Sequence, residues 1–259
     1  MLLRLASSAT LAIALVGSVV VADILPKDKR SGFDFMSPQT QSMQTDQTSN
    51  PGMFWVIDGE RLWNQPQGAA NKSCASCHDD AAKSMRGVAA RYPAFDEESK
   101  QPIDLAGRIN RCRQARQSAA PLARESDELL ALAAYVGYQS HGMPVTPAAD
   151  PRLQPFREKG RHWFERRLGQ LQLSCASCHD ERWGARLGGS VIPQAHPTGY
   201  PLYRLEWQTV GSLQRRLRGC LVGVRAEPFE FGAPEYVDIE LFLMSRATGL
   251  KMETPAVRP

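Results

Sequence analysis

The sequence of 259 residues contains few histidines and cysteines, five and six respectively, so the position of each one is informative. Long apolar runs are also scarce, and none after the first 22 residues is long enough to cross a bilayer. Neither sign of charge dominates, because 31 Lys and Arg stand against 27 Asp and Glu, for a formal net charge of +4. This balance gives no support to a nucleic-acid-binding function.

Four of the six cysteines lie in two copies of Cys-Ala-Ser-Cys-His, at Cys74–His78 and Cys175–His179. C-x-x-C-H is typical of c-type haem attachment, because two thiols bond one porphyrin while the adjacent imidazole ligates its iron. A zinc site would need a second ligand pair nearby, and a redox C-x-x-C needs no following histidine. We therefore expect two covalently bound haems c. The attachment residues are Cys74, Cys77 and His78 for the first haem, and Cys175, Cys178 and His179 for the second.

Residues 1–22 are predicted to be a cleaved signal peptide. Arg4 precedes an apolar run from Leu11 to Val21, and Ala22 closes a small-residue cleavage site. The run is short for a membrane span, although an uncleaved anchor is the alternative. Export together with haem c predicts a periplasmic protein whose mature chain has no membrane span.

The two motifs lie in halves of the chain that resemble copies of one unit. Gly59 and Gly160 are separated by the same number of positions as Cys74 and Cys175. Further along the chain, the two members of each matched pair are separated by more positions, because the second half has extra residues around Gly188–Gly199. We therefore expect an internal duplication.

The predicted fold class is all-α, with two tandem class I cytochrome c-like domains and an extended N-terminal arm. Each half is expected to close with an amphipathic helix, at Asp127–Ser140 and Glu235–Arg246, and a haem motif followed by a long last helix is typical of this fold. The arm is polar and lacks apolar periodicity, and Pro144, Pro147 and Pro151 mark the boundary between the halves. The expected divisions are a signal peptide at 1–22, the arm at 23–50, a first domain at 51–147 and a second at 148–259.

Cys112 and Cys220 are the two cysteines outside the motifs, and they occupy equivalent places in the two halves. On a helix, Leu213, Leu217 and Cys220 share one face, so the cysteine is expected to face a haem. Each is therefore a candidate sixth ligand of the iron. Two alternatives stay open: Met143 as the ligand in the first half, and a disulfide between the two cysteines.

Residues 215–229 resemble the A subunit of the SoxAX cytochrome complexes of sulfur-oxidising bacteria. Glu235–Leu241, Thr254–Arg258, Gly107–Cys112 and Tyr200–Arg204 are similar to the same family. The resemblance implies a diheme L-cysteine S-thiosulfotransferase, which couples thiosulfate oxidatively to a cysteine of the carrier protein SoxY. It also implies a heterodimer with a separate monohaem subunit, SoxX, which receives the electrons.

The resemblance further implies roles for individual residues. Cys112 would lie opposite His78, and Cys220 opposite His179, so these four residues would be the axial ligands of two irons. Cys220 would be modified to a persulfide and serve in catalysis, and Arg216 would bind substrate. The first site keeps its complete set of ligands, which matches the two-haem members of the family.

Thiosulfate is a small dianion, and guanidinium groups bind such oxyanions through charge-assisted hydrogen bonds. Arg216, one helical turn before Cys220, is therefore the main candidate to bind it. Arg186, which follows the second haem motif, is a weaker candidate. Other arginines crowd the same half, namely Arg204, Arg215, Arg218 and Arg225. A periplasmic diheme electron-transfer cytochrome without transferase activity is the alternative function, and a diheme peroxidase is a less favoured third.

Overall fold

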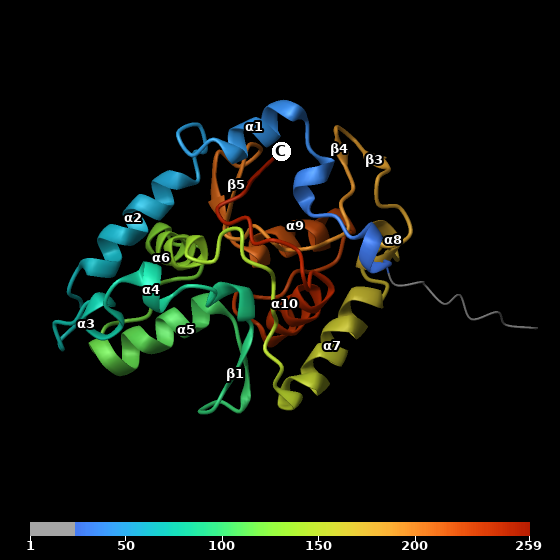
Figure 1. Cartoon of the computed structure of the whole chain (residues 1–259). Helices are drawn as coiled ribbons and strands as arrows, with labels where there is room; N and C mark the ends of the chain where they lie inside the picture. The colour runs from blue at the N-terminus through green and yellow to red at the C-terminus, as the bar shows by residue number, and fades with distance from the viewer. Residues whose placement is uncertain (1–23) are drawn as a thin grey trace, which may run out of the picture.

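The computed structural model describes residues 24–259 (Figure 1), so the predicted signal peptide lies outside the described residues. The chain is mostly helical, in agreement with the expected fold class, and short strands that the all-α expectation did not include lie between the helices. The helices of the first half are α2 (Met53–Asn64), α3 (Ala75–His78), α4 (Ala81–Ser84), α5 (Leu105–Cys112) and α6 (Asp127–Tyr138). Those of the second half are α7 (Gln154–Glu165), α8 (Cys175–His179), α9 (Leu213–Gly223) and α10 (Pro234–Arg246). From residue 24 onwards, no helix combines the length and apolar character that a membrane span requires.

Two helix crossings organise the fold, α2 against α6 and α7 against α10. A glycine lies at each crossing: a Cβ atom on Gly59 would meet the carbonyl oxygen of Ala131, and one on Gly160 would meet that of Asp238. Only a residue without a side chain permits such a close approach of two backbones. The spacing of these glycines in the sequence therefore reflects matched helix contacts.

A two-stranded hairpin precedes each of the two helices that bear Cys112 and Cys220, the cysteines outside the haem motifs. β1 (Ala94–Asp96) pairs with β2 (Gln101–Ile103) before α5, and β5 (Leu202–Arg204) pairs with β6 (Thr209–Gly211) before α9. A third strand, β7 (Val257–Arg258), joins β5 in parallel. The remaining hairpin is formed by β3 (Arg186–Leu187) and β4 (Ser190–Val191). Strands of two or three residues are too short for an alternating apolar pattern to reveal them.

Of the segment predicted as an extended arm, residues 23–50, the described part from residue 24 onwards is packed against the rest of the chain. It contains α1 (Pro38–Thr45), which lies beside the C-terminal strand β7 (Figure 1). Gln44 accepts a hydrogen bond from the backbone of β7 at 3.0 Å, and Asn50 donates one to the carbonyl oxygen of Pro255 at 2.9 Å. The polar side chains that suggested an extended arm are thus the groups that anchor it.

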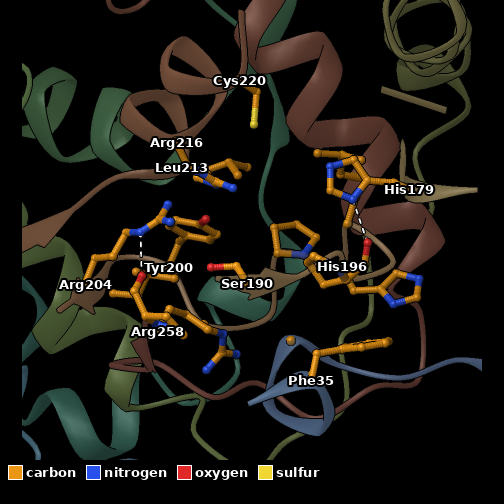
Figure 2. A pocket seen from close by; sticks show the side chains of 18 of the residues that line it. Phe35, His179, Ser190, His196, Tyr200, Arg204, Leu213, Arg216, Cys220 and Arg258 are labelled. Atoms are coloured by element: carbon orange, nitrogen blue, oxygen red, sulfur yellow. Dashed lines mark hydrogen bonds between the residues drawn. The ribbon is translucent and has the colours of Figure 1, made fainter. Parts of the chain in front are cut away.

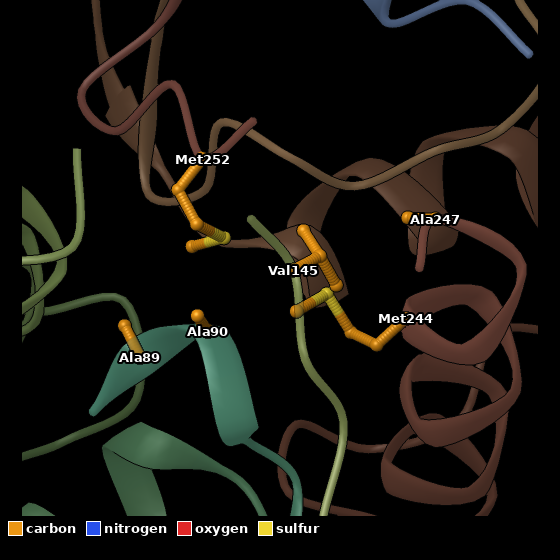
Figure 3. Close-up of a cluster of buried hydrophobic side chains, with 6 residues drawn as sticks. All are labelled: Ala89, Ala90, Val145, Met244, Ala247 and Met252. Carbon is orange, nitrogen blue, oxygen red and sulfur yellow. The ribbon is translucent and has the colours of Figure 1, made fainter. Parts of the chain in front are cut away.

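The proline-containing connection between the halves is part of a shared core. Val145 is fully buried there, among Ala89, Ala90, Met244 and Met252 (Figure 3). The connection also pairs with the end of the chain, because the Val145 amide donates to a backbone carbonyl there at 2.7 Å. Met244 and Met252 are therefore core residues, and neither lines the cavities described below.

Candidate functional site

A cavity of about 470 Å³ opens beside the first C-x-x-C-H motif. Cys74, Cys77, His78 and Cys112 all line it, so the histidine of the motif and the cysteine of α5 share one space. Met143 is not among its lining residues. Of the two candidate ligands in this half, the fold brings only the cysteine to the cavity.

The composition of this cavity fits a haem c. Most of its wall is apolar, and arginines add positive charge to it. Two buried polar atoms in the wall, Arg113 Nε and Gln117 Oε1, have no partner within residues 24–259. A porphyrin would cover the apolar wall, and its propionates would supply an acceptor for the unpaired Arg113 Nε. The apolar lining residues include Trp63, Met85, Val88, Leu105, Ile109 and Val136.

The serines that frame each motif explain why the short haem-motif helices form. Ser174 accepts a hydrogen bond from the Ser177 amide at 3.1 Å, and the Ser174 amide donates to the Ser177 hydroxyl at 3.3 Å. Ser73 and Ser76 make the same reciprocal pair at 3.0 Å in both directions. This arrangement resembles a capping box and satisfies two amides at the start of the turn. Sequence reasoning missed these serines, although their three-residue spacing was a usable signal.

The second cavity places His179 and Cys220 opposite each other (Figure 2). His179 Nδ1 lies 2.6 Å from the Pro193 carbonyl oxygen, which can only accept, so Nδ1 carries the proton and Nε2 remains free to bind a metal. Burial raises the pKa of the Cys220 thiol, but the neighbouring His179 ring and the Arg216 guanidinium outweigh it and lower that pKa to about 7. The site therefore favours an ionised sulfur, which is the form that binds iron and attacks sulfur.

Three arginines line this second cavity: Arg204, Arg216 and Arg258 (Figure 2). Arg186 does not, because it lies exposed on β3, while Ser190 of the neighbouring strand β4 reaches the cavity. The expectation that Arg186 belongs to the site is not supported by this placement. Arg215, Arg218 and Arg225 also lie outside the cavity lining.

The arginines in the cavity differ in their partners. Arg258 is paired with Glu253 and also contacts Gln44. The Arg216 side chain has no hydrogen-bond or ion-pair partner in the described part of the chain, and its pKa is raised above the ordinary arginine value because attraction to Cys220 outweighs its burial. A half-buried guanidinium without a counter-ion is available to bind an anion beside the sulfur.

A disulfide between Cys112 and Cys220 is excluded by their positions. Each lines a different cavity, and all cysteines in the described residues are free thiols. The structure thus brings each cysteine to the histidine of its own half, as the duplicated spacing predicts.

The N-terminal segment forms one wall of the second cavity, which sequence reasoning did not predict. Gly32, Phe35 and Met36 line the cavity. The segment is held there by His196, whose Nδ1 lies 2.7 Å from the carbonyl oxygen of Arg30. Burial lowers the pKa of His196 to about 4, so the ring is neutral near pH 7 and its Nδ1 proton makes this bond.

Two cavities, each lined by the histidine of a haem motif and by a cysteine of another helix, indicate a c-type cytochrome. Residues 58–145 match the family model "SoxA/TsdA, cytochrome c domain". Such a domain carries covalently bound haem c.

Full-length relatives refine this class. The chain is 40% identical to the L-cysteine S-thiosulfotransferase subunit SoxA of Pseudaminobacter salicylatoxidans over 229 residues, which cover 88% of this chain and 80% of that one. It is 36% identical to the corresponding subunit of Rhodovulum sulfidophilum over 229 residues, which again cover 88% of this chain and 80% of that one. The crystal structure of SoxXA from P. pantotrophus matches it with a TM-score of 0.87 and 32% identity, covering 92% of this chain and 90% of that one. The chain therefore belongs to the SoxA family of L-cysteine S-thiosulfotransferase subunits.

Proposed function

We propose that this chain acts in the periplasm as the A subunit of a thiosulfate-oxidising complex, attaching thiosulfate to a cysteine of a sulfur-carrier protein such as SoxY. The observation that carries this proposal is the second cavity, where Cys220 faces His179 and the unpaired Arg216 lies beside them. A cytochrome that only transfers electrons does not require an unpaired cation next to a reactive sulfur. Family membership, at 40% identity over most of the chain, supports the same activity.

We propose two haems c in two tandem cytochrome c-like domains, at 51–147 and 148–259. In this proposal His78 and Cys112 hold the first iron, while His179 and Cys220 hold the second. Matched helix crossings, matched serine caps and matched hairpins support an internal duplication. The predicted signal peptide supports periplasmic delivery.

When bound, the second haem supplies an electron acceptor and keeps the sulfur of Cys220 as a thiolate. Residues of this chain orient the ligand, bind the substrate and exclude water. His179 is fixed in one tautomer by the Pro193 carbonyl. Arg216 binds the thiosulfate dianion through charge-assisted hydrogen bonds. The apolar wall around Leu217 limits the access of water to the reacting sulfurs.

The proposed chemistry conserves atoms and electrons. The Cys220 thiolate and the terminal sulfur of thiosulfate form a sulfur–sulfur bond, and two electrons are released. The carrier thiolate then attacks the thiosulfate-derived sulfur, so that the new bond joins carrier and thiosulfate and Cys220 leaves as a thiolate. A persulfide on Cys220, which the family resemblance implies, would react in the same way through its outer sulfur.

Two released electrons require a separate acceptor, and we propose a monohaem SoxX subunit in a heterodimer with this chain. The similarity to the SoxXA structure supports this partner.

The proposal is tested by measuring thiosulfate attachment to the carrier by mass spectrometry with the haem-loaded complex. The Cys220→Ala variant is expected to lose the coupling activity, because it lacks the sulfur that exchanges. The Arg186→Gln variant, altered outside the cavity, is the control and should retain activity. Undiminished coupling by Cys220→Ala would contradict the proposal.

A further inference from the structure

Asp96 and Arg204 occupy equivalent positions in the two halves but carry opposite charges. Each is the last residue of the first strand in its hairpin, Asp96 paired in register with Gln101 and Arg204 with Thr209. Each hairpin then leads into the helix that bears the facing cysteine. The same backbone position therefore carries a carboxylate that pairs with Arg108 in the first half and a guanidinium that lines the cavity in the second.

In the first half this position neutralises the arginine that precedes the cysteine. Asp96 is buried and contacts Arg108 at 2.9 Å and Arg111 at 2.8 Å. Arg108, the counterpart of Arg216, is thus held by an internal anion. An added dianion would have to compete with the Asp96 carboxylate for Arg108.

In the second half the corresponding residue adds positive charge. Arg204 lines the cavity with Arg216 and Cys220 (Figure 2). Burial and the neighbouring Arg216 lower the pKa of Arg204 below the usual arginine value, which means that the two guanidinium groups repel each other across the cavity. The ion-pair partner of Arg204 within residues 24–259 is Glu206, at 2.9 Å, and that carboxylate is 66% exposed and strongly screened by water.

Extending the function proposed above, we propose that Arg204 is a second substrate-binding residue, which together with Arg216 binds the sulfonate oxygens of thiosulfate. Two cations match the two charges of the ligand, and binding relieves the repulsion between them. With the sulfonate held by both guanidinium groups, the terminal sulfur is left to meet Cys220. Asp96 neutralises Arg108, the counterpart of Arg216, so the first half lacks this pair of unneutralised arginines before its cysteine, and we assign substrate binding to the second half.

Arg204 also has a structural contact that the test must separate from substrate binding. Its Nε donates to the main-chain oxygen of Pro259, the last residue of the sequence, at 2.6 Å, which helps to hold the C-terminal residues beside β5. The Arg204→Gln variant removes the charge, whereas Arg204→Lys keeps the charge but loses the Nε donor. Rescue by lysine therefore distinguishes a role in anion binding from a role in packing.

The experiment measures the dissociation constant of thiosulfate by calorimetry with the oxidised, haem-loaded complex at fixed ionic strength, alongside KM and kcat for coupling. Arg204→Gln should weaken binding and raise KM by roughly tenfold to a hundredfold, because one charge-assisted hydrogen-bonding group is lost. Arg204→Lys should recover most of this affinity, and the surface control Arg186→Gln should stay within about twofold of the parent. Unchanged affinity in Arg204→Gln, or a lysine variant no better than glutamine, would overturn the inference.

Failure of this inference is distinct from failure of the proposed function. If Cys220→Ala abolishes coupling while Arg204→Gln binds thiosulfate normally, the proposed function is supported and the proposed role of Arg204 is wrong. If Cys220→Ala still couples thiosulfate to the carrier, the proposed function is wrong.

Discussion

Arg216 lies one helical turn before Cys220 on α9, and both side chains line the same cavity. The positive charge of Arg216 is one of the influences that lower the pKa of the Cys220 thiol. One guanidinium can therefore favour the ionised sulfur and bind an incoming anion. This pairing links the reactivity of the cysteine to the recognition of its substrate.

Replacing Arg216 with glutamine is expected to impair both roles. Loss of the charge-assisted hydrogen bonds should cost about 1.5–3 kcal/mol of substrate binding, which raises KM by roughly tenfold to a hundredfold. The Cys220 pKa should rise as well, because one of the influences that lower it is gone. Steady-state coupling kinetics measure the first effect, and KM equal to that of the parent would contradict the assigned role.

The matched change in the first half, Arg108→Gln, should affect stability and leave substrate binding intact. Arg108 is bound to the buried Asp96, so its loss leaves that carboxylate with one ion-pair partner, Arg111, and the hydrogen bonds from Ser99. We expect a loss of about 1–3 kcal/mol in the free energy of unfolding. Urea titration measures the loss, while KM for thiosulfate should match the parent. A large increase in KM would show that the two halves do not divide their roles in this way.

The serine caps should matter for the haem-motif helices. Ser174→Ala removes the acceptor for the Ser177 amide, at an expected cost of about 1 kcal/mol in the free energy of unfolding. Ser73→Ala in the first half is the matched variant, because Ser73 makes the same bond to Ser76. Thermal unfolding of both variants checks the prediction. Unchanged unfolding temperatures in both variants would contradict a stabilising role for these caps.

Asp238 gives the fold a predictable dependence on pH. Burial raises the pKa of this carboxyl to about 6, with nearby Lys159 opposing and Glu235 reinforcing the shift. Its Oδ1 has no hydrogen-bond partner in the described residues. Because the folded state binds the proton more tightly than the unfolded state, the contribution of Asp238 to stability falls as the pH rises from about 4 to about 6.

Asp238→Asn should therefore be more stable than the parent above pH 6, by about 1–2 kcal/mol, since the neutral amide avoids the cost of a buried charge. The difference should shrink toward pH 4, where the carboxyl of the folded parent is protonated and carries no buried charge. Urea unfolding at pH 4 and pH 7.5 measures both values. A variant that is less stable than the parent at pH 7.5 would contradict the argument.

Much of the site follows from the sequence because its signals are local. The spacing within each C-x-x-C-H motif and the helical repeat from Leu213 to Cys220 both act over a few residues, and both cysteines reach their cavities as predicted. The closing helices were also predicted closely, at Asp127–Tyr138 and Pro234–Arg246 in the structure.

The parts that sequence reasoning missed depend on contacts between distant segments. Gln44 reaches β7 across most of the chain, so no local pattern marks the N-terminal segment as packed. Arg186 was favoured over Arg204 because it follows the haem motif, but the β3–β4 hairpin places it at the surface. Comparison of the two halves position by position would have aligned Arg204 with Asp96, and the reversal of charge was therefore a signal available in the sequence.

Low-temperature electron paramagnetic resonance of the oxidised, haem-loaded protein tests the central claim most directly. The parent should give low-spin signals of histidine–thiolate coordination from two haems. Cys112→Ala and Cys220→Ala should each remove one set of these signals and leave the other. Histidine–methionine signals that persist unchanged in both variants would contradict the account, because neither cysteine would then be a ligand of iron.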